Sequence, residues 1–459
     1  MTLSFGAIRA GLLGAALCVG LVAGPQLAKA EDTFKFGGVF TLSGPASFLG
    51  LFEEAAVRLA VEQFMKGDCI VEAVPPQPCE GGGLKIGDKV VPIEWTAYDD
   101  VSEDKKSIDA VIRLVEQDEA RAIWGPRMNS ALLSAASILD PQGIISICAI
   151  CSSPAMTVGR KYGHDITDTG VIEKHGMGEF IHESPERLAE HGIDPALFDG
   201  RKKLGFIGRN ELYTVHGSIG WQEAVEKGGG RYEYQHDWAV LYPFGTTDFA
   251  PHVAKLAEQD PDIVLMDAYI FPDMLALMSE MKKQGLDYET GEIILLGNDV
   301  LMLQVFVDVA KDQGINMSSG YVWGWQEHNP AQDEATLARV EKYVPIYNAK
   351  YGDTEVGSSS PFDRGAYDAA IWFLYGVQAS GDHTDNDKIV EAWRNLKING
   401  LRGPTNEFFT RPDTGEKTGQ LFATEYIIGV ADDKVFYTGI SYRDELFYGP
   451  YVYGDKLPK

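Results

Sequence analysis

Short apolar strands alternate with helices along most of this 459-residue chain. Residues 36–42 form an apolar run, residues 43–45 read Ser-Gly-Pro, and residues 46–64 carry apolar side chains at helical spacing. A strand, a turn and a helix in this order form the repeating unit of a parallel sheet. Two separate runs of such units, in residues 36–147 and 204–297, predict two Rossmann-like α/β lobes.

The last part of the chain departs from this alternation. Residues 334–351 and 366–377 have helical patterns, and the second of these segments is almost entirely apolar. Residues 408–453 are rich in Thr, Tyr, Val and Ile, with turns at Gly and Asp. This composition predicts short antiparallel strands.

Residues 1–30 have the features of a secretory signal peptide. Arg9 precedes an apolar centre at residues 10–22, and Ala28-Lys29-Ala30 forms a cleavage site of small residues. The apolar run is too short and too interrupted by Gly and Pro for a membrane anchor. Lipidation at Cys18 is a lesser alternative, because Leu17 before it is bulkier than such signals prefer. We expect export, with cleavage after about Ala30.

The chain is strongly acidic, with a formal net charge of −27. The signal segment carries two positive charges and no negative ones, so the exported protein is more acidic still. Nucleic acid is therefore excluded as a partner. The sequence has no GxSxG, P-loop or HExxH motif and no GxGxxG after a strand. We expect neither catalysis nor a metal or cofactor.

Four cysteines lie outside the signal segment. Cys69 and Cys79 flank a loop rich in Pro and Gly, and in an oxidising compartment they predict a disulfide. Cys148 and Cys151 have the spacing of a redox or metal motif. They lie in an apolar run without a second pair of metal-spaced ligands, so we expect buried small side chains.

Polar and aromatic side chains gather where the predicted strands end. Because the carboxyl ends of parallel strands face one crevice, groups distant in sequence can converge there. The set predicts a ligand cleft between the two lobes. Its segments are residues 43–49, 127–130, 151–153, 209–213, 267–271 and 298–299.

The order of these segments resembles a known family, the type I periplasmic solute-binding proteins of the leucine/isoleucine/valine type. The resemblance begins with KFGGVFTLSGPASFLG at residues 35–50 and covers nearly the whole exported chain. It continues through Tyr98-Asp99-Asp100, Trp124-Gly125, Ser152-Ser153-Pro154, residues 207–213, Pro272-Asp273-Met274 and Gly297-Asn298-Asp299. It implies that two lobes close on one small-molecule solute and deliver it to an ABC-type permease in the periplasm.

The resemblance also implies how the chain divides. The first lobe is expected at residues 31–168 and 326–403. The second lobe is expected at residues 169–325 and 404–459, and segments between these parts cross from one lobe to the other.

Individual ligand contacts follow from the same resemblance. The loop that holds a ligand carboxylate corresponds to Arg127, Asn129 and Ser130, and the next strand end supplies Cys151 and Ser152. The second lobe contributes an aromatic residue over the ligand and an acid for an α-ammonium group. The remaining expected contacts are Phe48 and Leu49 for the ligand side chain, and Tyr213, Asp267, Tyr269 and Asp299 from the second lobe.

Arg127 departs from the family pattern, which has small hydroxylated residues in this loop. An arginine facing the cleft holds a carboxylate bidentately, whereas one facing elsewhere forms an ion pair within its lobe. The first case predicts an acid, and with Asp299 a zwitterion. An aliphatic amino acid and an aromatic acid both fit, and an uncharged amide or urea is third. The rival functions are a ligand-sensing module for a membrane receptor and, least favoured, a secreted enzyme.

Overall fold

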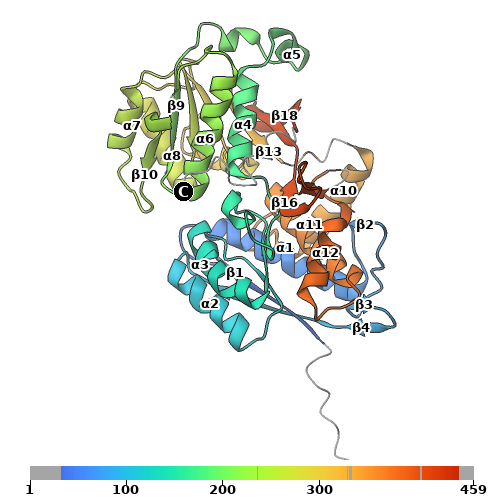
Figure 1. Ribbon diagram of the computed structural model, residues 1–459. Helices are drawn as coiled ribbons and strands as arrows, with labels where there is room; N and C mark the ends of the chain where they lie inside the picture. Colours follow the sequence, from blue (N-terminus) through green and yellow to red (C-terminus); the bar gives the residue numbers. More distant parts are fainter. Residues whose placement is uncertain (1–32, 235, 328, 330–332, 404–405, 444–459) are drawn as a thin grey trace, which may run out of the picture.

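The computed structural model describes residues 33–443 except 235, 328, 330–332 and 404–405. The expected signal peptide lies outside the described residues, as do residues 444–459 of the tail. Two lobes are present, each built on a seven-stranded sheet covered by helices (Figure 1). The prediction of two α/β lobes is confirmed.

The sheet of the first lobe is parallel except at one edge, where β15 pairs antiparallel with β16. β1 lies between β5 and β6 and pairs in parallel with both. In spatial order the strands are β15 (Glu407–Thr410), β16 (Lys417–Phe422), β8 (Gly163–Asp165), β7 (Ile145–Cys148), β6 (Ala122–Trp124), β1 (Phe34–Phe40) and β5 (Ile93–Asp99).

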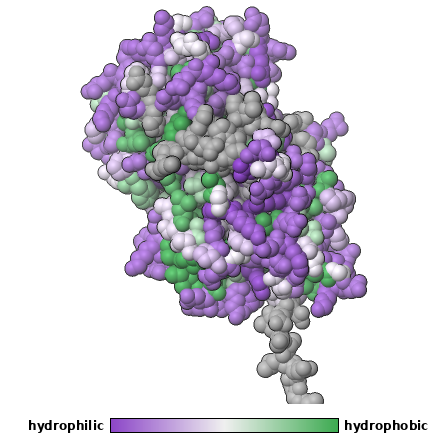
Figure 2. Space-filling view, viewed as in Figure 1, coloured by the Kyte–Doolittle hydropathy of each residue, from purple (hydrophilic) through white to green (hydrophobic). Residues whose placement is uncertain are grey.

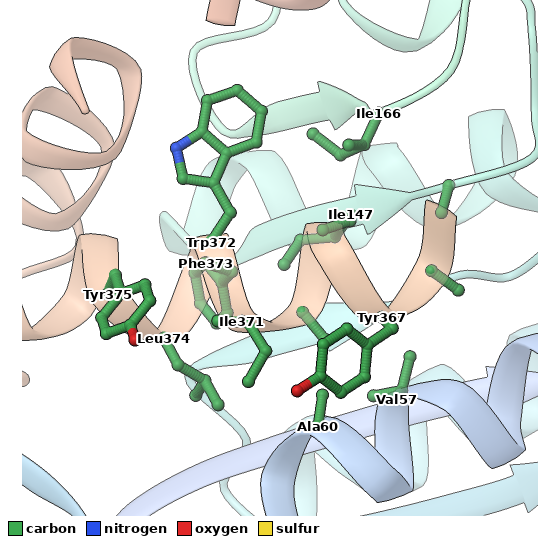
Figure 3. Close-up of a cluster of buried hydrophobic side chains, with 14 of the residues drawn as sticks. Val57, Ala60, Ile147, Ile166, Tyr367, Ile371, Trp372, Phe373, Leu374 and Tyr375 are labelled. Atoms are coloured by element: carbon green, nitrogen blue, oxygen red, sulfur yellow. The ribbon is translucent and has the colours of Figure 1, made fainter. Parts of the chain in front are cut away.

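Helices α1 and α11 pack against each other beside this sheet. Figure 3 shows Val57 and Ala60 of α1 next to Tyr367 of α11. Ile147 of β7 lies on the other side of α11, which explains why α11 is apolar on nearly every face. The helices are α1 (Ser47–Lys66), α2 (Asp104–Glu116), α3 (Asn129–Leu139), α10 (Glu334–Tyr351), α11 (Pro361–Ala379) and α12 (Asn386–Asn395). Two small sheets pair β2 (Glu72–Val74) with β14 (Lys397–Asn399) and β3 (Leu84–Ile86) with β4 (Lys89–Val91).

The second lobe has a sheet of five parallel strands extended by an antiparallel pair. In spatial order its strands are β10 (Val240–Tyr242), β9 (Leu204–Arg209), β11 (Ile263–Asp267), β12 (Ile294–Gly297), β13 (Ser319–Gln326), β17 (Glu425–Ala431) and β18 (Lys434–Tyr442). Its helices are α4 (Gly170–Ile181), α5 (Pro185–Glu190), α6 (Leu212–Lys227), α7 (Ala250–Ala257), α8 (Phe271–Lys283) and α9 (Gln304–Asp312).

The chain crosses between the lobes after β8, after β13 and after β16. The expected boundary at residue 404 is wrong, because β15 and β16 belong to the first sheet. Gln420 of β16 pairs with Asp165 of β8, so the last crossing comes at residues 423–424. The sequence of the β15–β16 hairpin predicts two strands, but it does not predict which of the two sheets these strands join.

Both cysteine pairs form disulfides. Cys69 is bonded to Cys79, as the sequence predicts. Cys148 is bonded to Cys151, and both side chains are buried, as the sequence predicts. The visible surface is mostly hydrophilic, with hydrophobic residues near the junction of the lobes (Figure 2). Over the part of the chain that the structure describes, no helix is both long and apolar enough to cross a bilayer.

Candidate ligand-binding site

A pocket lies between the lobes, at the carboxyl ends of their parallel strands. It encloses about 450 Å³ of space, part of which is open to solvent. The first lobe supplies Arg127, Met128, Asn129, Ile150, Cys151, Ser152 and Phe362, and the second supplies Glu173, Tyr213, Tyr269, Asp299 and Val300. Seven of the expected contacts are among them.

A larger surface hollow lies on the first lobe, between α12 and the β15–β16 hairpin. Four of its charged groups are paired with each other, Lys161 with Asp387 and Arg411 with Asp413. It also lies away from the strand ends. The pocket between the lobes is therefore the better candidate site.

Arg127 faces this pocket from the loop after β6. It is buried, and its Nε has no hydrogen-bond partner among the described residues. Its guanidinium carbon lies 5.6 Å from the ring centre of Tyr269 in the other lobe. Burial lowers the pKa of Arg127, and the carboxylates of Glu53, Glu211 and Asp299 oppose that shift. The side chain thus carries an unused donor toward the cleft.

The first-lobe wall continues with amide and hydroxyl groups. Asn129 begins α3, and its buried Oδ1 has no partner in the described structure. Cys151 and Ser152 follow β7 at the pocket edge. Ser130 points away instead, because its exposed hydroxyl donates to Asp104 at 2.6 Å, so its expected role in the pocket is wrong. One residue of helical rotation separates it from the pocket side of α3.

Glu173 and Lys174 were not expected from the sequence. The hydroxyl of Tyr213 donates to Glu173 at 2.7 Å, and Lys174 Nζ lies 3.0 Å from the same carboxylate. Lys174 also lies 3.1 Å from Asp267 and 3.4 Å from the ring centre of Tyr213. Asp267 is thereby held in a buried ion pair behind the pocket, which corrects its expected role as a direct ligand contact.

Asp299 follows β12 and lines the pocket from the second lobe. Burial raises its pKa well above the usual range, and the carboxylates of Glu173 and Glu327 raise it further. Lys174 opposes the shift. A carboxylate held in such surroundings is costly for the empty protein, and groups of this kind concentrate at functional sites.

Tyr269 is placed between two arginines. Its ring centre is 4.2 Å from the guanidinium carbon of Arg209, and its hydroxyl donates to Glu211 at 2.9 Å. Burial raises the pKa of Glu211 to about 7. Arg209 and Glu211, at the end of β9, fix the ring against which Arg127 lies.

Phe48 and Leu49 do not line the pocket, so their expected contact with a ligand side chain is wrong. Phe48 packs against Phe271 of the second lobe, with ring centres 4.5 Å apart and the ring planes tilted by 45°. Leu49 is fully buried in a hydrophobic cluster made mainly of second-lobe residues. The first turn of α1 therefore joins the lobes beside the pocket.

Comparisons with known proteins agree with this architecture. A family model described as periplasmic binding protein matches residues 33–430. A leucine-binding protein from Thermotoga maritima has a TM-score of 0.67 at 17% identity, covering 90% of this chain and 99% of that one. A solute-binding protein from R. palustris, in complex with 4-hydroxybenzoate, has a TM-score of 0.66 at 17% identity, covering 90% and 98%.

A third solved structure extends the range of bound solutes among these similar folds. The branched-chain amino acid binding protein of Streptococcus pneumoniae, in complex with isoleucine, has a TM-score of 0.64 at 18% identity. It covers 90% of this chain and 99% of its own. No curated protein sequence matches this chain. At these identities the likeness concerns the fold.

Proposed function

This chain belongs to the periplasmic binding protein family, and we propose that it captures a small carboxylate-bearing solute, an α-amino acid, for an ABC-type importer. One observation carries the proposal. An arginine on one lobe and a carboxylate on the other, Arg127 and Asp299, face the same pocket. A zwitterion matches both charges at once.

The carboxylate end is assigned to the first lobe. The buried Nε of Arg127 lacks a partner among the described residues, and leaving such a donor unpaired costs roughly 1 to 3 kcal/mol. A solute carboxylate removes that cost through a bidentate, charge-assisted contact. Asn129, Cys151 and Ser152 lie at the same wall and complete the polar surroundings.

The ammonium end is assigned to Asp299. Glu173, the other pocket carboxylate, already has Lys174 and the Tyr213 hydroxyl as partners. Burial raises the pKa of Asp299, and the nearby carboxylates of Glu173 and Glu327 raise it further while Lys174 opposes the shift. An ammonium group relieves this repulsion, whereas an aromatic acid without an amino group adds to it. The second-lobe wall therefore favours amino acids over simple acids.

Closure of the lobes follows from the division of these contacts. A solute that touches Arg127 and Asp299 stabilises the closed arrangement over the open one. Phe48 and Phe271 contribute a second contact across the junction, and this one does not involve the solute. The affinity for solute therefore depends on the pocket and on the contact between the Phe48 and Phe271 rings beside it.

Phe48→Ala is expected to weaken the binding of every solute alike, by roughly 2- to 10-fold, because an aromatic pair contributes about 0.5 to 1.5 kcal/mol. Calorimetry with two amino acids measures the effect, and fluorescence transfer between dyes on the two lobes reports closure. Phe436→Ala, on β18 of the second lobe, is the matched control and should leave affinity unchanged. A changed preference between the two amino acids would instead make Phe48 a pocket wall.

Affinity for amino acids is expected to fall as pH falls through the raised pKa of Asp299. Burial raises the pKa of Asp299, with Glu173 and Glu327 adding to the shift and Lys174 opposing it. Protonated Asp299 no longer attracts an ammonium group, so binding is lost as pH falls through that raised pKa. Calorimetric titrations at a series of pH values provide the measurement, and a flat profile would contradict the assignment.

The stability of the empty protein is expected to follow the opposite trend. Burial also raises the pKa of Asp165 and Glu425, well above the usual range. These groups bind protons more tightly in the folded chain than in the unfolded chain, where their pKa is about 4. Their contribution to the free energy of unfolding is therefore largest at acid pH and declines as pH rises through the folded pKa. Thermal melts without solute provide the measurement.

Export to the periplasm and delivery to a permease are part of the proposal. The signal features of residues 1–30 support export, with cleavage after about Ala30. Sequencing the amino terminus of the exported protein tests the cleavage point. Cross-linking in the membrane fraction separates a permease partner from a receptor, since a ligand-sensing module shares this fold.

A thermal-shift screen over amino acids, aromatic acids, amides and ureas tests the proposed solute class. A bound solute raises the melting temperature by mass action, and we expect the largest rise with an amino acid. If hydroxybenzoates alone raise the melting temperature, the solute is an aromatic acid and not an amino acid. Chemical turnover without stoichiometric binding would contradict the non-enzymatic role.

A further inference from the structure

The Cys148–Cys151 disulfide lies in the wall of the proposed binding pocket. Cys148 is the last residue of β7, and Cys151 lines the pocket together with Ile150 and Ser152. The Cα atoms of the two cysteines are 5.8 Å apart. Both side chains are buried, in a small cluster with Leu132 and other apolar residues. The bond therefore closes a short loop that carries pocket residues.

The backbone of this loop is held at both ends. Cys148 O accepts from Ile166 N at 2.7 Å, and Ser152 O accepts from Gly170 N at 2.6 Å. Both donors belong to the segment that crosses to the second lobe. Ser152 has a φ of 54°, a left-handed conformation that a serine adopts only where its surroundings impose it.

The disulfide also meets the arginine loop. Sγ of Cys151 lies 3.4 Å from the carbonyl oxygen of Arg127, and a disulfide sulfur has no hydrogen to donate, so this is a packing contact. The same bond thus braces the turn at Ser152 and the backbone that carries the arginine. The pocket wall assigned to the solute carboxylate depends on both.

We propose that the Cys148–Cys151 disulfide is a positioning element of the binding site, so that its reduction loosens the pocket wall and weakens solute binding. The effect on affinity rests on the proposed function, whereas the effect on the loop does not. A dithiol reductant supplies the chemistry. One of its thiolates attacks one protein sulfur and displaces the other, which forms a mixed disulfide with the attacked cysteine. The second thiolate of the reductant then displaces the attacked cysteine and closes the reductant's own disulfide. Two electrons and two protons pass to the cysteines, and the reductant becomes a disulfide.

Linkage makes this proposal reciprocal. If reduction lowers the affinity for a solute by some factor, the bound solute must favour the oxidised bond by the same factor. The Cys69–Cys79 disulfide closes a loop that contributes no residue to the pocket. It therefore provides an internal control within the same molecule.

The test equilibrates the full exported chain with dithiothreitol redox buffers, with and without an equimolar mixture of the amino acids that occur in proteins, cysteine left out because its thiol would alter the redox buffer. Thiol labelling and mass spectrometry give the reduced fraction of each disulfide. We expect the amino acids to protect Cys148–Cys151 on the order of tenfold and to leave Cys69–Cys79 unchanged. Hydrogen exchange of residues 149–152 reports the loop without any solute and should accelerate on reduction.

Two variants complete the design. Cys148→Ala/Cys151→Ala should reproduce the reduced protein, with faster exchange at residues 149–152 and affinity lower by about tenfold. Cys69→Ala/Cys79→Ala should retain wild-type affinity. Unchanged exchange and affinity in the first variant, or free thiols at Cys148 and Cys151 in the untreated protein, would overturn the proposal. Faster exchange in a protein whose oxidised form binds no amino acid would support the positioning role and contradict the proposed function.

Discussion

Arg127→Ala should weaken the binding of every carboxylate-bearing solute by about 100-fold or more. Truncating one partner of a buried, hydrogen-bonded charge pair costs roughly 2 to 5 kcal/mol. Arg127 offers such a contact because it is buried, faces the pocket and has a free Nε donor among the described groups. Isothermal titration calorimetry with the best amino acid of the screen measures the loss.

Two variants separate recognition from stability. Glu53 lies near Arg127, and the arginine opposes the rise that burial causes in its pKa. Removing the arginine takes away that favourable charge and leaves the buried carboxyl with hydrogen bonds alone, so the alanine variant is also less stable. Arg127→Lys keeps the positive charge but loses the bidentate contact that a guanidinium group makes with a carboxylate. It should still bind carboxylate-bearing solutes at least 10-fold more weakly than the wild type. Arg58→Ala removes an exposed arginine of α1 and serves as the control.

Wild-type affinity in a folded Arg127→Ala protein would remove this side chain from carboxylate recognition. Asn129 and the residues after β7 would then be the remaining candidates. Loss of affinity only for aromatic acids would show that the arginine, beside the Tyr269 ring, binds aromatic acids and that amino acids do not use it. Each outcome identifies a different part of the first-lobe wall.

The fold was predictable because its main signal is local. An apolar strand followed by a turn and a helix, as in residues 36–64, specifies a parallel βα unit without knowledge of the rest of the chain. The rule that such strands end at one edge then brings Arg127, Cys151, Tyr269 and Asp299 toward one cleft. These side chains do line the pocket.

The misplaced residues have a common physical cause. Phe48, Leu49 and Ser130 occupy the first turn of a helix, where one position of rotation decides between the pocket and a neighbouring element. Phe48 and Leu49 turn toward the other lobe, and Ser130 turns toward Asp104. The spacing of apolar residues predicts a helix. It does not predict how the helix is rotated about its axis, because that rotation is set by packing against neighbouring elements.

The two charged residues that sequence reasoning missed, Glu173 and Lys174, come from a segment that crosses between the lobes. Both lie in α4, in a region whose sequence predicts only a crossover with a helix of its own. In the structure both are buried, and Lys174 meets Asp267 and Tyr213. The available signal was a pair of opposite charges next to each other in a helix that is otherwise rich in apolar residues. Such a helix is expected to be buried, and buried charges are expected to be paired.

Asp299→Asn should have opposite effects on two classes of solute. Affinity for amino acids is expected to fall at least 10-fold, because a charge-assisted contact to the ammonium group is lost. Affinity for an aromatic acid such as 4-hydroxybenzoate should rise, because one negative charge is removed from a pocket that already contains Glu173. Parallel calorimetric titrations measure both changes. Asp312→Asn, an exposed acid at the end of α9, is the control.

The stability of the unliganded variant distinguishes binding from structure. Burial and the nearby Glu173 and Glu327 disfavour ionised Asp299, so replacing it with an isosteric amide should leave the melting temperature equal or higher. A residue that supports the fold would lower it. If the affinity for amino acids is unchanged, the ammonium group must instead meet Glu173, and Glu173→Gln should then show the loss. If Asp299→Asn is more stable than the wild type and binds amino acids more weakly, then the ionised carboxylate of Asp299 is unfavourable in the empty protein. The bound ammonium group is what stabilises that charge.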